Sequence, residues 1–173
     1  MNINDIIIEY EQNAARAASL LSYSNNLKLL EKFKKTVIEY KNPEPEILNA
    51  LIKIYENRQW EDAYSWLIVA QLHPSEKYSE VICNILNLKD ENAPNEAIVE
   101  LLIDLKEQRC VYSLKNLISA DFITQDEQLI LKILEALSEI GGDEAISVLK
   151  NFSKSLSRTI REEADLLLDD MEQ

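Results

Sequence analysis

The chain has 173 residues, a formal net charge of −13 and 46% hydrophobic residues, which suits one domain with a continuous core. Only two residues are Gly and four are Pro, so the chain is poorly equipped for the tight turns of a β-sandwich or β-barrel. The negative charge repels phosphate backbones and anionic lipids, which argues against nucleic acid and membrane partners and favours a basic protein.

Apolar residues recur at spacings of three and four almost throughout, which predicts an all-α fold of about ten helices. Pro and Gly mark several of the breaks, the Gly141-Gly142 pair most clearly. Short connections between helices of this length are typical of stacked antiparallel hairpins. We predict helices over residues 3–21, 24–40, 44–58, 59–72, 74–89, 95–107, 110–119, 125–140, 143–153 and 157–171.

The charge is uneven along the chain. Residues 1–41 carry 6 Lys/Arg and 5 Asp/Glu, whereas residues 42–173 carry 12 and 26. All of the excess negative charge therefore lies after Lys41, and a basic partner should meet that part of the chain.

Residues for catalysis or metal binding are sparse. The one His, His73, precedes Pro74 in a predicted turn, and no zinc, serine-hydrolase or glycine-rich phosphate motif occurs. We expect no enzyme activity, no cofactor and no metal site. We expect Cys83 and Cys110 to be buried, reduced thiols. The start of the chain lacks a signal-peptide pattern and the longest apolar stretch is short, so a cytoplasmic location is expected.

A shift of 35 residues superimposes two segments of the sequence. Glu100 to Leu105 falls on Glu135 to Ile140, and Leu114 to Leu117 falls on Leu149 to Phe152. A two-helix unit that recurs at this period predicts an α-solenoid.

The same region carries a family resemblance. The pattern Ala136-Leu137-x-x-Ile140-Gly141-x-x-Glu144-Ala145-Ile146-x-x-Leu149 resembles the bacterial HEAT-like repeat, the type also found in phycobilin lyases. Arg161-Glu-x-Ala164-x-x-x-Leu168 resembles the opening helix of a following repeat. The resemblance is good over 125–171 and weaker back to residue 44. It implies a right-handed α-α superhelix over 1–173, with HEAT-like hairpins from 44 and a divergent N-terminal cap over 1–41.

Two surfaces are candidates for partner binding. Glu100 and Asp104 recur one repeat later as Glu135 and Glu139, which predicts a ladder of carboxylates along one side of the stack. A similar stripe on the last helix contains Glu162, Asp165, Asp169 and Glu172. Such stripes are also typical of a solvated helix face, and the aromatic residues 60–66 suit a buried helix as well as an interface. The predicted partner-binding residues are Glu96, Glu100, Asp104, Glu107, Glu135, Glu139, Trp60 and Tyr64.

These features favour a protein-binding module over an enzyme. Because HEAT-like proteins occur among bacterial antidotes, the resemblance implies an immunity protein (antitoxin), monomeric when free, that occludes a cationic toxin such as a nuclease. An adaptor or scaffold in a cellular complex is the alternative. An enzyme of lyase or glycosylase type would need a pocket with converging polar groups, which the sequence does not indicate.

Overall fold

The computed structural model describes residues 2–19 and 23–171, and these residues form α-helices and short 3₁₀-helices with no strand. The prediction of an all-α protein is therefore confirmed. The chain divides into two compact units, an N-terminal unit that runs to Ser75 and a C-terminal unit that begins at Glu76.

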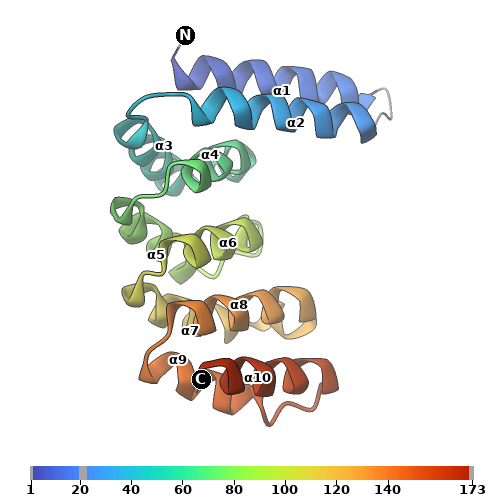
Figure 1. Cartoon of the computed structure of the whole chain (residues 1–173), viewed down its shortest axis with the longest axis vertical. Coiled ribbons are helices and arrows are strands. Elements are labelled where there is room, and N and C mark those ends of the chain that lie inside the picture. Colours follow the sequence, from blue (N-terminus) through green and yellow to red (C-terminus); the bar gives the residue numbers. More distant parts are fainter. Residues whose placement is uncertain (1, 20–22, 172–173) are drawn as a thin grey trace. The chain divides into compact units, whose positions relative to one another are not determined.

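The N-terminal unit contains four helices, α1 (Ile3–Ser19), α2 (Tyr23–Ile38), α3 (Glu44–Asn57) and α4 (Trp60–Leu72). Within this unit α1 pairs with α2 and α3 pairs with α4, while α4 also contacts both α1 and α2 (Figure 1). Their apolar faces supply buried side chains such as Ile3, Phe33, Val37 and Leu51. The pairing follows from the spacing of these residues, which repeats every three or four positions.

His73 forms the C-terminal cap of α4, as the predicted turn requires. Its Nε2 donates a hydrogen bond of 2.9 Å to the carbonyl oxygen of Val37 on α2. This bond ties the end of α4 to the other helix pair and gives the one His a structural role.

The C-terminal unit contains α5 (Ser79–Asn87), α6 (Asn95–Leu105), α7 (Val111–Ile118), α8 (Glu127–Ile140), α9 (Asp143–Phe152) and α10 (Arg158–Met171). Three 3₁₀-helices, η1 (Glu76–Tyr78), η2 (Gln108–Cys110) and η3 (Asp121–Gln125), lie between or before them. The helices form two rows. In one row α8 packs between α6 and α10, and in the other α7 packs between α5 and α9 (Figure 1).

The core of the C-terminal unit lies between its two rows. Leu101, Leu114, Leu137 and Leu149 are each fully buried, and Leu101 and Leu137 come from the first row while Leu114 and Leu149 come from the second. Ala136 is also fully buried. A small side chain at this position lets neighbouring helices approach closely.

The helix ends follow local sequence signals. The Asp126 side chain accepts a 3.0 Å hydrogen bond from the Leu129 amide and caps the start of α8. Gly141 and Gly142, at φ +76° and +91°, end α8 and begin α9. These φ values lie in the region that favours glycine, so the predicted stop signal is confirmed.

The predicted helix bounds agree with the structure to within two residues with one exception. A helix was expected to begin at Pro74, but the chain first makes the 3₁₀ turn η1 and α5 begins at Ser79. The proline ring fixes φ of one residue at a value that suits a helix, but proline has no backbone N–H to donate to a helical hydrogen bond. The predicted end of the first helix at residue 21 lies outside the described residues.

The two cysteines form a disulfide, so the prediction of reduced thiols is wrong. Cys83 lies on α5 and Cys110 at the end of η2, directly before α7, and their Cα atoms are 5.5 Å apart because α5 and α7 are neighbours in one row. This separation is well suited to a bridge. The sparse cysteines argued against a disulfide scaffold, but one bridge between adjacent helices needs only two.

None of the described helices is both long enough and apolar enough to cross a membrane.

Candidate protein-interaction surfaces

Charge in the C-terminal unit is concentrated in one row of helices. Together, α6, α8 and α10 carry eleven acidic and three basic residues, whereas α5, α7 and α9 carry three and two. We call the helices α6, α8 and α10 the acidic row. A field of one sign over a continuous helix layer attracts partners of the opposite sign.

The predicted ladder begins on α6, where a lysine from α8 reaches two of its carboxylates. The Lys132 ammonium donates a 2.8 Å hydrogen bond to Glu96 and a second bond to Glu100. Partial burial lowers the pKa of this ammonium, but its hydrogen bonds to Glu100 and Glu96 outweigh that effect, so its pKa lies above the ordinary value. Sequence reasoning missed Lys132, because its partners lie on another helix, 36 and 32 residues earlier in the chain.

A second lysine interrupts the ladder at its other end. Lys106, just after α6, donates a 2.6 Å hydrogen bond to Glu139 on α8. Asp104 and Glu135 are exposed, and neither is part of an ion pair among the described residues. The predicted carboxylates thus lie on two neighbouring helices, α6 and α8. Glu96, Glu100 and Glu139 are neutralised by lysines, whereas, within the described ranges, Asp104 and Glu135 are not.

Glu107 is held inside its own turn instead of lining the acidic row. Its carboxylate accepts a 2.9 Å hydrogen bond from Arg109 and a 3.5 Å hydrogen bond from the Ser79 hydroxyl. The Arg109 hydrogen bond, reinforced by its charge, holds the pKa of Glu107 below its ordinary value. The arrangement joins the start of α5 to η2 and gives Glu107 a structural role.

The least neutralised part of the acidic row is α10. Asp165, Asp169 and Asp170 are exposed and form no ion pair among the described residues, while Glu162 is paired with Arg158 at 2.6 Å. Leu166 lies among these carboxylates and is 55% exposed. The sequence pattern identified the charged stripe but not Leu166. The spacing of apolar residues on α10 does not show which of them a neighbouring helix covers.

The two predicted aromatic anchors lie on α4, in the N-terminal unit. The guanidinium of Arg58 lies 5.3 Å from the ring centre of Tyr55 and 5.9 Å from that of Trp60. Such cation–π contacts fix the Trp60 ring against its own unit. Tyr64, one turn later, is 59% exposed and remains available to a partner.

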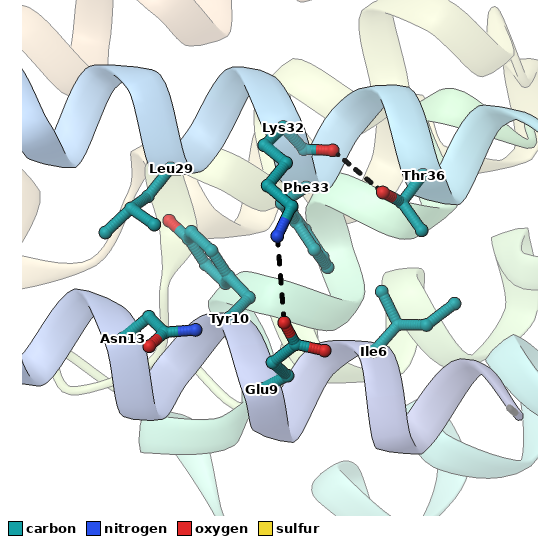
Figure 2. A pocket seen from close by; sticks show the side chains of 8 residues that line it. All are labelled: Ile6, Glu9, Tyr10, Asn13, Leu29, Lys32, Phe33 and Thr36. Atoms are coloured by element: carbon teal, nitrogen blue, oxygen red, sulfur yellow. Dashed lines mark hydrogen bonds and ion pairs between the residues drawn. The ribbon is translucent and has the colours of Figure 1, made fainter.

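A small cavity of about 130 Å³ lies between α1 and α2. The rings of Tyr10 and Phe33 stack inside it with centroids 4.3 Å apart, and the ammonium of Lys32 lies 3.8 Å from the Glu9 carboxylate across it (Figure 2). The cavity has room for about one apolar side chain, but its one acidic and one basic residue give no preference for the charge of an occupant.

A larger groove of about 530 Å³ is lined by α1, α3 and α4. Most of its lining residues are polar, but the most buried ones, which include Trp66, are apolar. Sequence reasoning did not find this groove. The sequence pattern identified Trp66 as part of the aromatic segment. It did not show the groove beside Trp66, because the groove depends on how three helices pack. In the ranges 2–19 and 23–171 no group of three or more His, Cys, Asp or Glu residues could hold a metal ion.

No family model matches the chain, and neither a curated protein nor a solved structure matches it. The similarity to HEAT-like repeats is therefore a resemblance in sequence pattern alone, and a fold of that kind would not fix a function.

Proposed function

We propose that the chain is a protein-binding module that recognises a basic protein through the acidic row. More specifically, we propose an immunity protein that neutralises a cationic bacterial toxin, such as a nuclease, by covering its active site. The observation that carries the proposal is the concentration of eleven acidic residues on α6, α8 and α10.

The physical basis is charge complementarity. A toxin that binds an anionic substrate presents clustered Lys and Arg side chains, and these would pair with exposed carboxylates such as Asp104, Glu135 and Asp169. Long-range attraction accelerates association and makes it sensitive to salt. The exposed Leu166 offers an apolar contact within the acidic surface, and such contacts slow dissociation.

Three further expectations belong to this proposal. The helices are expected to form a right-handed HEAT-like solenoid, the protein to be monomeric when free, and its location to be cytoplasmic. In a reducing cytoplasm the Cys83–Cys110 bridge would be open for part of the time. Binding through the acidic row does not require the bridge, because neither cysteine is exposed there.

A pull-down with the tagged full chain from its native host tests the proposal. The bait is compared with a variant that carries Asp104→Lys, Glu135→Lys, Asp165→Lys and Asp169→Lys. The matched control reverses four exposed carboxylates outside the acidic row, Glu31, Glu39, Glu56 and Glu91, and so has the same net charge. Captured proteins are identified by mass spectrometry at low salt and after a high-salt wash.

We expect the unmodified chain and the control variant to capture one basic protein, and the acidic-row variant to lose it. High salt should release this protein. Addition of the purified chain should then inhibit the activity of that protein. Equal loss with both variants would contradict recognition through the acidic row. Capture of a multi-subunit assembly would contradict the antitoxin assignment and favour the adaptor alternative.

A further inference from the structure

The groove in the N-terminal unit is built from one face of each of three helices. Asn4, Ile8 and Glu11 of α1 line it at spacings of four and three, which place them on one helix face. Faces of α3 and α4 complete it, and its volume is about 530 Å³. From Asn4 to Glu11, α1 rises by about 10 Å, which is the length of about three residues of an extended peptide.

The charged side chains of the groove favour a cation. Glu11, Glu46 and Asp62 come from α1, α3 and α4, and Lys53 is the one basic residue among the described residues that line the groove. Neither Glu11 nor Asp62 forms an ion pair within the described ranges. Glu46 accepts a 3.2 Å hydrogen bond from the Tyr40 hydroxyl, which leaves its other oxygen for a ligand.

Three amide side chains line the same groove. Asn4, Asn49 and Gln59 are exposed, and none of these side chains hydrogen-bonds to another residue in the described part of the chain. An amide both donates and accepts hydrogen bonds, so it can pair with the N–H and C=O groups of a peptide backbone. Their distribution over α1, α3 and the start of α4 suits a ligand that runs along the groove.

The most buried residues that line the groove are apolar, and we call them its floor. Ile54 and Trp66 of the floor are 4% and 9% exposed, whereas Ile8, which also lines the groove, is 43% exposed. An apolar side chain of a ligand would cover Ile8 and extend the contact to the Trp66 ring. Large aromatic side chains in such positions are typical contact residues of protein interfaces.

We propose that this groove binds an extended segment of a basic protein, with an apolar side chain on the floor and flanking Lys or Arg side chains on Glu11, Glu46 and Asp62. We infer a peptide because the three amide side chains can hydrogen-bond to the N–H and C=O groups of a peptide backbone. We infer a basic peptide because three carboxylates and only one lysine, Lys53, line the groove in the described part of the chain. The site lies in the N-terminal unit and does not depend on the acidic row.

Nuclear magnetic resonance of the ¹⁵N-labelled full chain tests the proposal. The probe is the blocked peptide acetyl-Lys-Arg-Leu-Lys-Arg-amide, titrated to about 5 mM because short segments bind weakly. The readout is the indole N–H signal of Trp66. The chain has two Trp residues, so the one indole signal that remains in a Trp60→Phe variant belongs to Trp66. The variants compared are E11Q/D62N in the groove and D165N/D169N on α10, which remove the same charge.

The Trp66 signal should shift in a saturable manner, and E11Q/D62N should raise the apparent Kd about five-fold, as expected for two exposed charge pairs. D165N/D169N should leave this Kd within two-fold, roughly the effect of screened charges that do not contact the peptide. Replacement of the central Leu of the peptide by Ala should also weaken binding. An unshifted Trp66 signal, or equal effects of the two double variants, would overturn the proposal without bearing on the acidic row.

Discussion

The ammonium nitrogen of Lys132 on α8 lies 2.8 Å from a carboxylate oxygen of Glu96 on α6. The same ammonium also donates to Glu100, so one side chain of α8 bridges two successive turns of its neighbour. Only 21% of the Lys132 side chain is exposed, which reduces the screening of these interactions by water. Lys132, one of the few basic residues of the acidic row, thus joins α8 to α6.

We predict that Lys132→Gln lowers the free energy of unfolding by about 1 kcal/mol, near the upper value for a partly exposed pair. The substitution removes one charge, so Glu96 and Glu100, one turn apart on α6, lose the cation that they share. Urea unfolding monitored by circular dichroism measures the change. Lys154→Gln is the matched control, because Lys154 is exposed and lies in no ion pair among the described residues. Equal effects of the two substitutions would show that the bridge adds no stability.

Gly141 gives a prediction about the turn between α8 and α9. Its φ of +76° and ψ of −169° lie in a region that is essentially restricted to glycine. No other group lies within 4 Å of a Cβ built there, so Gly141→Ala tests backbone strain without a steric clash. We expect a loss of about 1–3 kcal/mol in the free energy of unfolding, measured by urea titration.

Ser147→Ala on the exposed side of α9 is the control for that substitution, with an expected change within about 0.5 kcal/mol. A Gly141→Ala variant as stable as this control would mean that the turn adopts another backbone conformation in solution.

Features that depend on neighbouring residues were predictable from the sequence. The helices, the Gly141-Gly142 stop and the turn at His73 follow from spacing and backbone preference, which act over a few residues. The register of Glu100 with Glu135 was also visible as a 35-residue shift, and the structure places their helices side by side.

Features that depend on packing were not predictable in the same way. The bridge by Lys132 and the disulfide from Cys83 to Cys110 join residues 27 to 36 positions apart, and each needs two helices to lie at the correct rotation about their axes. The groove beside Trp66 needs three helices. Periodicity predicts which face of one helix is buried, but not which neighbouring faces leave a hollow.

Glu107 gives a prediction about pH. Because its hydrogen bond with Arg109 lowers its pKa from 4.5 in the folded state, the carboxylate stabilises the fold at pH values above its unfolded pKa. That contribution is lost as the pH falls through the lowered, folded pKa. The Glu107→Gln variant should therefore unfold at lower urea concentration than the unmodified chain at pH 7, and the difference should shrink as the pH falls below 4.5 and through the lowered pKa.

Glu91→Gln, in the exposed turn between α5 and α6, is the control for general charge effects in that comparison. A difference between the Glu107→Gln variant and the unmodified chain that stays constant with pH would rule out the charged form of Glu107 as its cause.

The bridge between Cys83 and Cys110 closes a segment with a sequence separation of 27, and closure of a loop of this length is worth about 3.5 kcal/mol. In a chain of this size, reduction should lower the Tm by about 7–14 °C. Differential scanning calorimetry with and without dithiothreitol measures the shift, and thiol alkylation with intact-mass analysis confirms the redox state. The Cys83→Ala/Cys110→Ala variant should unfold at one Tm in both conditions. If the reductant leaves the Tm of the unmodified chain unchanged, helix packing alone holds α5 to α7, and the fold is equally suited to a reducing cytoplasm.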